Sequence, residues 1–267
     1  MFRRQIWRFS LTAILTLAVF ATTAVAQGDC IDNRRIVGGV DTDIKEHPWQ
    51  VALYLLATDG LCGGSLIQDR WVLTAAHCFA DSAVPQSIRV KAGATNYQQG
   101  GAWTEVEKVV IHENYDASTH ENDLALVRLK SATPGDTIPL AGANQPLKAC
   151  DKLEVTGWGR TSEGGQVSDT LQKGEILYVE NATCNAADIY DGDVKQGMMC
   201  AGFRDGGVDS CQGDSGGPLV LRGEDGPVLV GVVSWGEGCA RKLRYGVYTR
   251  VNAYNDWIAK TILANEN

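Results

Sequence analysis

The stretch DSCQGDSGGP at residues 209–218 decides the fold of this 267-residue chain. Its Ser215 is preceded by the pair Gly213 and Asp214 and is followed directly by two glycines. Glycines around a serine suit a tight turn that presents the hydroxyl beside free backbone N–H groups. The segment therefore indicates a nucleophilic serine, and the rest of the chain must supply the base that would activate it.

Two further segments supply residues of the expected types, LTAAHC at 73–78 and ENDLAL at 121–126. Taken singly, a histidine after an apolar run is usually structural, and an aspartate before a strand is usually a turn residue. In the order His77, Asp123 and Ser215, however, the three segments closely resemble the chymotrypsin/trypsin family of serine proteases. The resemblance runs from Ile36 to about Asn265. It includes the further motifs IVGG at 36–39, CGGSL at 62–66, GWG at 157–159, SWG at 234–236 and GVYTRV at 246–251.

Short apolar runs rich in Val, Leu and Ile recur along the chain between Gly, Asp and Asn residues, which predicts an all-β protein with many strands. The tail at about 252–264 predicts a helix, because Tyr254, Trp257, Ile258 and Leu263 lie near helical spacing. The resemblance implies two packed six-stranded antiparallel β-barrels followed by this helix. We expect the first barrel at about 36–148, the second at about 149–250, and the active-site cleft between them.

The chemistry of the three residues agrees with their order in the family. A serine hydroxyl is a poor nucleophile at neutral pH and needs a base that titrates in that range, as an imidazole does. We expect His77 to be that base, Asp123 to hold its tautomer, and Ser215 to attack the peptide carbonyl. The N–H groups of Gly213 and Ser215 would form the oxyanion hole, at roughly 3–4 kcal/mol per donor.

Two alternatives stay open at this point. The chain could be a catalytically silent binding module of the same fold. It could be an esterase without proteolytic activity, although the activation site and Asp209 disfavour this. The remaining histidines, which are His47, His112 and His120, have no catalytic context in the sequence and are expected to be surface or structural residues.

Substrate preference is indicated by Asp209, six residues before the nucleophile. Family members with trypsin-like specificity have an aspartate at this position, at the base of the primary pocket. The resemblance places Gly236 and Gly246 in the pocket walls, and Ser210 could add a hydrogen bond to a lysine. Because a buried carboxylate is costly without a cationic partner, we expect cleavage after Arg or Lys. The alternative is that Asp209 is a turn residue beside a chymotrypsin-like or elastase-like pocket.

The N-terminus predicts export and activation by cleavage. Three arginines within the first eight residues precede an apolar run at 11–25 and an Ala-Val-Ala site, so residues 1–26 are expected to be a signal peptide rather than a membrane anchor. Residues 27–35 would be a propeptide and 36–267 the peptidase domain. In the family, a cut after Arg35 would free the amino group of Ile36 to pair with Asp214. The alternative is that the Arg34-Arg35 pair is only an exposed dibasic site.

The eight cysteines and the absence of any C-x-x-C pair favour disulfides in an oxidising compartment over zinc. The resemblance implies three bridges, Cys62–Cys78, Cys184–Cys200 and Cys211–Cys239. Two cysteines are left over, and we expect Cys30 to pair with Cys150 and tether the propeptide after cleavage. The alternative is two unpaired or intermolecular thiols. The protein is therefore expected to be secreted, either to the extracellular space or to a periplasm.

The net charge of −8 disfavours nucleic-acid partners and a membrane-bound mature form. We expect a monomer that acts on proteins or peptides with Arg or Lys and that protein protease inhibitors could block. No cofactor and no metal are required. Calcium is not expected, because the loop at 93–100, where related trypsins bind it, has no acidic residue. Relatives with Tyr at the position of Tyr245 often bind Na⁺ through the adjoining loop, here 240–244, so Na⁺ could modulate activity unless this side chain merely packs.

Overall fold

The computed structural model describes residues 39–79 and 83–266. Its strands are β1 (Val40–Asp41), β2 (Gln50–Leu55), β3 (Gly60–Gln68), β4 (Trp71–Thr74), β5 (Ile88–Ala92), β6 (Ala102–Ile111), β7 (Ala125–Leu129), β8 (Lys152–Gly157), β9 (Gln172–Val179), β10 (Met198–Ala201), β11 (Pro218–Gly223), β12 (Gly226–Trp235) and β13 (Gly246–Arg250). Its α-helices are α1 (Asn181–Cys184) and α2 (Asn255–Ala264), and its short 3-10 helices are η1 (Ile44–Glu46), η2 (Ala76–Phe79), η3 (Pro85–Ser87) and η4 (Val251–Ala253).

The first barrel is closed in the strand order β2-β3-β4-β7-β6-β5, and all neighbouring strands are antiparallel. It closes because β2 pairs with β3 on one edge and with β5 on the other. Leucines at 53, 73 and 126 are fully buried inside it, so the short apolar runs of the sequence form its core. The barrel thereby gives rigid ends to β4 and β7, which flank the histidine and aspartate motifs.

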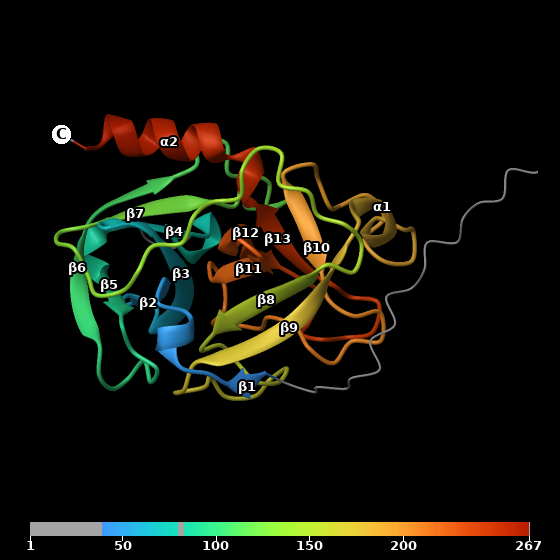
Figure 1. Cartoon of the computed structure of the whole chain (residues 1–267), viewed down its shortest axis with the longest axis horizontal. Coiled ribbons are helices and arrows are strands. Elements are labelled where there is room, and N and C mark those ends of the chain that lie inside the picture. Colours follow the sequence, from blue (N-terminus) through green and yellow to red (C-terminus); the bar gives the residue numbers. More distant parts are fainter. Residues whose placement is uncertain (1–38, 80–82, 267) are drawn as a thin grey trace, which may run out of the picture.

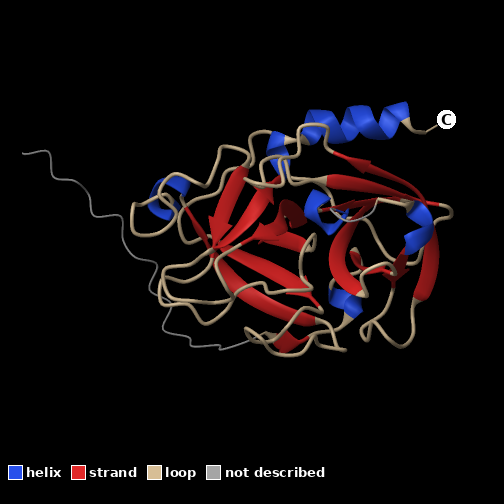
Figure 2. Ribbon diagram, turned by 180° about the vertical axis from the view of Figure 1, so that it is seen from behind, coloured by secondary structure: helices blue, strands red, loops and turns tan. Residues whose placement is uncertain are grey.

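The second barrel contains β8, β9, β10, β13, β12 and β11, and pairing between β8 and β9 closes it. The predicted fold of two six-stranded antiparallel barrels is therefore confirmed, and Figures 1 and 2 show the barrels side by side. One detail differs from the expected barrel boundary. The short strand β1 pairs with β9 of the second barrel, because β2 already has partners on both edges, whereas β9 has room beside Gln172 and Lys173.

The C-terminal helix returns from the second barrel to the first and lies along β7 in Figure 1. Its buried stripe is Tyr254, Ile258 and Ile262, a spacing of four residues that keeps one face on the barrel. Leu263, which the sequence suggested for this stripe, is 71% exposed, because it lies one residue past the face that Ile262 occupies. The Trp257 indole donates a hydrogen bond to Glu113 Oε2 at 2.7 Å and adds a polar contact at the rim.

The two barrels also share a core, since Val220, Leu229 and Val232 of the second barrel belong to the same buried cluster as the first-barrel residues. A buried hydrogen bond of 2.6 Å joins Thr156 Oγ1 to Gln50 Oε1 across this interface. The relative position of the barrels is therefore fixed by apolar packing and by polar contacts. Within residues 39–79 and 83–266, no helix is long and apolar enough to cross a bilayer.

Candidate active site

The side chains of His77 and Asp123 meet at the interface of the two barrels. His77 lies in η2 directly after β4, and Asp123 precedes β7, the strand that pairs with β4. His77 Nδ1 lies 2.7 Å from Asp123 Oδ2, and the His77 backbone N–H donates to Oδ1 at 2.9 Å. The carboxylate therefore holds both the ring and the main chain of the histidine, which leaves the other ring nitrogen, Nε2, for a substrate-side partner.

The second barrel completes the surroundings of Asp123. Ser234 Oγ donates to Asp123 Oδ2 at 2.5 Å, and Thr249 Oγ1 donates to the Asp123 backbone carbonyl at 2.7 Å. The Asp123 side chain has no exposed surface. Burial alone would raise the pKa of Asp123, but the hydrogen bonds from His77 and Ser234 outweigh it and lower the pKa below its ordinary value. The aspartate is therefore held ionised beside the imidazole.

Ser215 is attached to the same region from the second barrel. The N–H of Gly63 in β3 donates to the Ser215 carbonyl at 2.7 Å. The neighbouring Cys62 forms a disulfide with Cys78, the residue after His77. A side chain on Gly216 would overlap Thr74 Oγ1, so the glycine after the serine permits close approach to the end of β4. These contacts bring the serine loop against the strand that leads into His77.

The backbone around the serine also presents free donors. Gly213 has φ of +99°, in the region that favours glycine. Among the described residues, the N–H groups of Gly213 and Ser215 donate to no protein acceptor, whereas the N–H of Asp214 donates to the Cys211 carbonyl at 2.9 Å. Two free amides on either side of one bonded amide form the type of arrangement that binds an oxyanion.

Asp209 lies under the glycines that the sequence assigned to a pocket. A methyl group placed on Gly246 would come within 2.5 Å of Asp209 Oδ1, and one placed on Gly236 would meet no atom closer than 3.8 Å. The backbone N–H groups of Ser210 and Ala240 donate to the Asp209 carboxylate at 2.8 and 3.2 Å. The structure thus brings together the four residues predicted for the primary pocket.

The electrostatics of Asp209 differ from those of Asp123. Asp209 keeps part of its surface accessible, yet enough protein surrounds its carboxyl that burial raises its pKa to about 7. The two backbone donors act against this rise, and the charge of Asp214 adds to it. No basic side chain among the described residues offsets the burial. This carboxyl is therefore suited to bind a cation that the described residues do not supply.

Asp214, one residue before the serine, lies in a second enclosed position. Its Oδ1 accepts from the Gly159 N–H at 2.7 Å, and its Oδ2 accepts from the Cys211 N–H at 3.0 Å. Burial raises the pKa of Asp214 to about 6, against these two bonds. It lines a cavity of about 50 Å³ that also borders Gly39, the first described residue. Arg35 and Ile36, predicted to form the activation site, lie outside the described residues.

One residue near the site was not identified from the sequence. His120 was expected to be a surface or structural residue, but its ring centroid lies 6.0 Å from that of His77 and 6.3 Å from that of Trp235. Its φ of +58° is unusual for a residue other than glycine. Burial lowers the pKa of His120, so the ring favours the neutral form. The only signal in the sequence was its position three residues before Asp123.

The disulfides join the loops that carry these residues. The structure contains Cys62–Cys78, Cys184–Cys200 and Cys211–Cys239, which are the pairs implied by the resemblance. The third connects the serine loop to the loop after Gly236. Cys150 is also disulfide-bonded. Its predicted partner, Cys30, lies outside the described residues, so that pairing stays a prediction.

Comparison with known proteins agrees with this geometry. The sequence model of the family described as Trypsin matches residues 36–258. A curated relative, "Transmembrane protease serine 11C" of Mus musculus, is 42% identical over 229 residues. The match covers 84% of this chain and 53% of the relative, so the chain spans about half of the relative's length.

Proposed function

Because the chain belongs to the trypsin family of serine proteases, we propose that it is a secreted endopeptidase that cuts peptide bonds after Arg or Lys. The observation that carries the specificity is Asp209, an enclosed carboxyl beneath Gly246 that has no basic partner within residues 39–79 and 83–266. A guanidinium or ammonium group supplies the missing positive charge, and an apolar side chain would leave the carboxyl unpaired. Ser210 lies beside the carboxyl and contributes a hydroxyl for a lysine.

In the proposed reaction, His77 accepts the Ser215 proton as the hydroxyl attacks the peptide carbonyl. The negative charge that develops on the carbonyl oxygen is bound by the N–H groups of Gly213 and Ser215, each contributing about 3 kcal/mol. His77 then gives the proton to the leaving amine, which produces the acyl-enzyme. Water hydrolyses the acyl-enzyme through the same steps. Asp123 keeps the ring oriented and stabilises the imidazolium that forms.

Activation is proposed to follow from a cut after Arg35, which frees the amino group of Ile36. The enclosed carboxyl of Asp214 is suited to receive that cation, because burial raises its pKa to about 6 and no basic side chain of the described residues offsets this burial. The cavity of about 50 Å³ borders both Asp214 and Gly39, which is three residues after Ile36 in the sequence. The ion pair would order the adjacent amides of residues 213–215, so the uncut chain is proposed to be a zymogen.

The mature enzyme is proposed to act outside the cytoplasm as a monomer, on proteins and peptides that contain Arg or Lys, and to be open to protein protease inhibitors. The predicted signal at residues 1–26 and the three disulfides support export. A Cys30–Cys150 bridge would keep the propeptide attached after the cut. Non-reducing mass spectrometry of the cut protein tests this, and release of a free propeptide would contradict it.

No cofactor is proposed to be required, and Na⁺ is proposed as a modulator through the loop at 240–244. In the structure Tyr245 is buried, and its carbonyl accepts a hydrogen bond of 2.6 Å from the Tyr190 hydroxyl. Equal kcat/KM values in NaCl and in choline chloride would contradict this proposal. Calcium addition is expected to leave the activity unchanged.

A chromogenic arginine ester tests the proposed function. We expect the chain cut after Arg35 to release a burst of product equal to the enzyme concentration, and the uncut chain to release little. The Ser215→Ala variant should lose the burst and keep its fold by circular dichroism. A folded, correctly cut protein without a burst would instead be a binding module. Cleavage of a peptide library by the same sample reports whether Arg and Lys precede the cut.

A further inference from the structure

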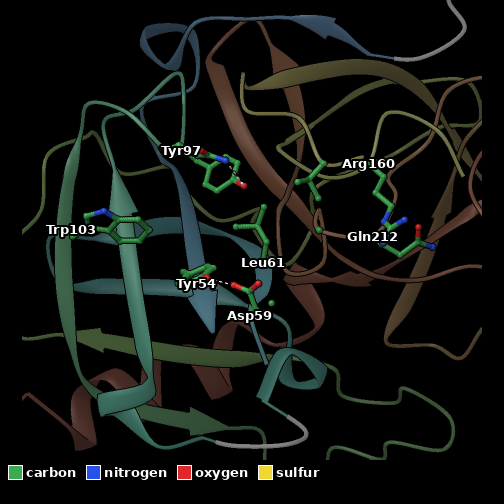
Figure 3. Close-up of a pocket in the computed structure, with 11 residues that line it drawn as sticks. Tyr54, Asp59, Leu61, Tyr97, Trp103, Arg160 and Gln212 are labelled. Atoms are coloured by element: carbon green, nitrogen blue, oxygen red, sulfur yellow. Dashed lines mark hydrogen bonds between the residues drawn. The ribbon is translucent and has the colours of Figure 1, made fainter. Parts of the chain in front are cut away.

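A pocket and a polar network both border the proposed reaction centre. The pocket has a volume of about 650 Å³ and includes Gly213 in its lining, so it belongs to the substrate cleft. Figure 3 shows Tyr54 and Trp103 in its first-barrel wall, where their rings lie 6.4 Å apart. The polar network surrounds the backbone of Asp123, and the proposed reaction assigns it no role.

The backbone at Asp123 forms a tight turn. The Leu124 N–H donates to the Asn122 carbonyl at 2.7 Å, which closes a three-residue turn with Asp123 at its centre. Asn122 has φ of +57°, in the left-handed region that asparagine adopts more readily than most residues other than glycine. The place of the Asp123 carboxylate therefore depends on the conformation of the residue before it.

The side chain of Asn122 is hydrogen-bonded at both ends of its carboxamide. Its Nδ2 donates to the Asn114 carbonyl at 2.8 Å, and its Oδ1 accepts from the Tyr254 hydroxyl at 3.2 Å. Asn114 lies in the loop that follows β6, and Tyr254 directly precedes α2. Because two separate elements hold the carboxamide, these bonds stabilise the left-handed turn at Asn122 in addition to satisfying its polar atoms.

Both partners of Asn122 are held in turn by His112, a buried residue at the end of β6. The edge of one ring meets the face of the other between His112 and Tyr254, with 5.5 Å between their centroids. The His112 Nδ1 atom accepts from the Asn114 N–H at 3.2 Å, and the His112 backbone N–H donates to the Leu124 carbonyl at 3.0 Å. These contacts close the network on both sides of the aspartate turn.

We propose that Asn122 is a positioning residue for the reaction and that the Tyr254 hydroxyl acts through it. The carboxamide of Asn122 holds the turn in which Asp123 keeps its two contacts with His77, at 2.7 Å from the ring Nδ1 and 2.9 Å from the backbone N–H. The residue before the C-terminal helix thereby contributes to proton transfer as well as to stability. The kinetic part of this inference rests on the proposed function.

Two replacements of Asn122 separate the effect of its side chain from that of its backbone. Asn122→Gly keeps the left-handed conformation and loses both hydrogen bonds, whereas Asn122→Ala also disfavours that conformation. On an arginine amide substrate, we expect kcat to fall about twentyfold in Asn122→Gly and on the order of a hundredfold in Asn122→Ala. KM should change less than about twofold, because the Asp209 pocket is untouched. The burst gives the concentration of active sites, so loss of folded protein does not lower the measured kcat.

Tyr254→Phe tests the contribution of the residue before the helix. The variant removes one hydroxyl and keeps the ring that packs on His112, and we expect kcat to fall about fivefold. In the Asn122→Gly background, Tyr254→Phe should have no further effect on kcat, because the carboxamide that its hydroxyl binds is absent. Tyr178→Phe in β9 changes a similarly buried tyrosine outside the network and is the matched control, with kcat expected to stay within about twofold. Effects of Tyr254→Phe that are the same in both backgrounds would overturn its action through Asn122.

Proton NMR measures the same contact without catalysis. The proton between His77 Nδ1 and Asp123 Oδ2, which lie 2.7 Å apart, is expected to resonate downfield and to be protected from exchange with water. In Asn122→Gly this resonance should move upfield and exchange faster than in the parent protein. In Tyr178→Phe it should match the parent.

The outcomes separate this inference from the proposed function. A burst in Asn122→Gly followed by a kcat within twofold of the parent would overturn the positioning role and leave the protease assignment intact. Absence of any burst in the parent, cut after Arg35, would overturn the protease assignment. In that event the NMR comparison decides the positioning role. A shifted, faster-exchanging resonance in Asn122→Gly supports it, and a resonance identical to that of the parent overturns it.

Discussion

Asp123 in the first barrel and the pair Asp209 and Asp214 in the second barrel are all enclosed carboxylates, yet their pKa values move in opposite directions. The pKa of Asp123 is lowered, although its side chain has no exposed surface. Burial raises the pKa of Asp209 to about 7 and that of Asp214 to about 6. Burial alone therefore does not set the charge of a carboxyl group in this protein.

The opposite pKa shifts come from different hydrogen-bond donors to the three carboxylates. Asp123 accepts bonds from the His77 ring and the Ser234 hydroxyl in addition to a backbone N–H. Among the described residues, Asp214 accepts from two backbone N–H groups, and Asp209 accepts from two backbone N–H groups and the Ser210 side chain, so neither has a cationic donor. A carboxylate that is already paired can position a neighbour, whereas an enclosed carboxylate without a cation is stabilised by one that arrives. We assign these arriving cations as the substrate side chain for Asp209 and the new amino terminus for Asp214.

The largest effect is expected when the paired carboxylate is replaced. Asp123→Asn should lower kcat by about ten-thousand-fold, because the amide favours the wrong tautomer of His77 while the local shape is kept. The measurement is kcat on a peptide amide substrate. Ser234→Ala, which removes one donor and keeps the carboxylate, is the control and should lose much less. A decrease below tenfold in Asp123→Asn would show that this aspartate only fills space.

A smaller effect is expected at the first unpaired carboxylate. Asp209→Ser should lower kcat/KM for arginine substrates by about a hundred- to a thousandfold, because the guanidinium would then be enclosed without a partner. Activity on a substrate with Leu before the cut should be kept or increased, which controls for damage to the neighbouring Asp214 and Ser215. An unchanged preference for Arg would show that another group binds the charged side chain of the substrate.

Asp214, the second unpaired carboxylate, should affect the stability of the chain before it is cut after Arg35. Its native pKa of about 6 exceeds the ordinary value of 3.8, so the uncut native protein binds more protons than the unfolded chain between about pH 4 and 6. Stability therefore falls as the pH rises through this range. Asp214→Asn should remove this loss and stabilise the uncut chain at pH 7.5 by about 2–3 kcal/mol.

Urea unfolding of the uncut chain at pH 4.5 and pH 7.5 measures this gain. The exposed Asp69→Asn is the matched control and should change the free energy of unfolding by less than about 0.5 kcal/mol. After the cut, Asp214→Asn should be inactive, because the new amino group has no negative charge to pair with. Equal stability of the variant and the parent at pH 7.5 would contradict the proposal that Asp214 has no cationic partner before the cut.

The fold and most of the candidate site followed from local motifs in the sequence. Ser215, Asp214 and Gly213 share one short turn, and His77 and Asp123 precede or follow strands that pair with each other, so few contacts between distant segments had to be inferred. The short apolar runs predicted many strands, and the resemblance to the family implied the two barrels. The Cys30–Cys150 pair, Arg35 and Ile36 remain predictions from the sequence.

The rest depended on how distant segments fold together. His120 reaches the cleft through a left-handed turn that no residue type in its loop announces. Tyr54 and Trp103 meet because β2 and β6 both pair with β5, a register that alternating apolar residues do not specify. The strand β1 joins the second barrel because the first is already closed. The last two features are consequences of strand pairing between segments far apart in the chain.

The smallest expected effect is a pH dependence of ligand binding at Asp209. Below its pKa of about 7 the carboxyl is increasingly protonated, and a neutral acid attracts an amidinium or guanidinium less strongly. The Kd of a small arylamidine should therefore increase by up to tenfold for each pH unit below about 7, and level off above about 8. Calorimetry on the cut Ser215→Ala variant measures this without catalysis, which separates it from proton transfer at His77. Asp209→Ser should bind weakly at every pH. A Kd that stays constant from pH 5.5 to 8 would mean that Asp209 is already paired, and the difference between the two barrels would then disappear at this position.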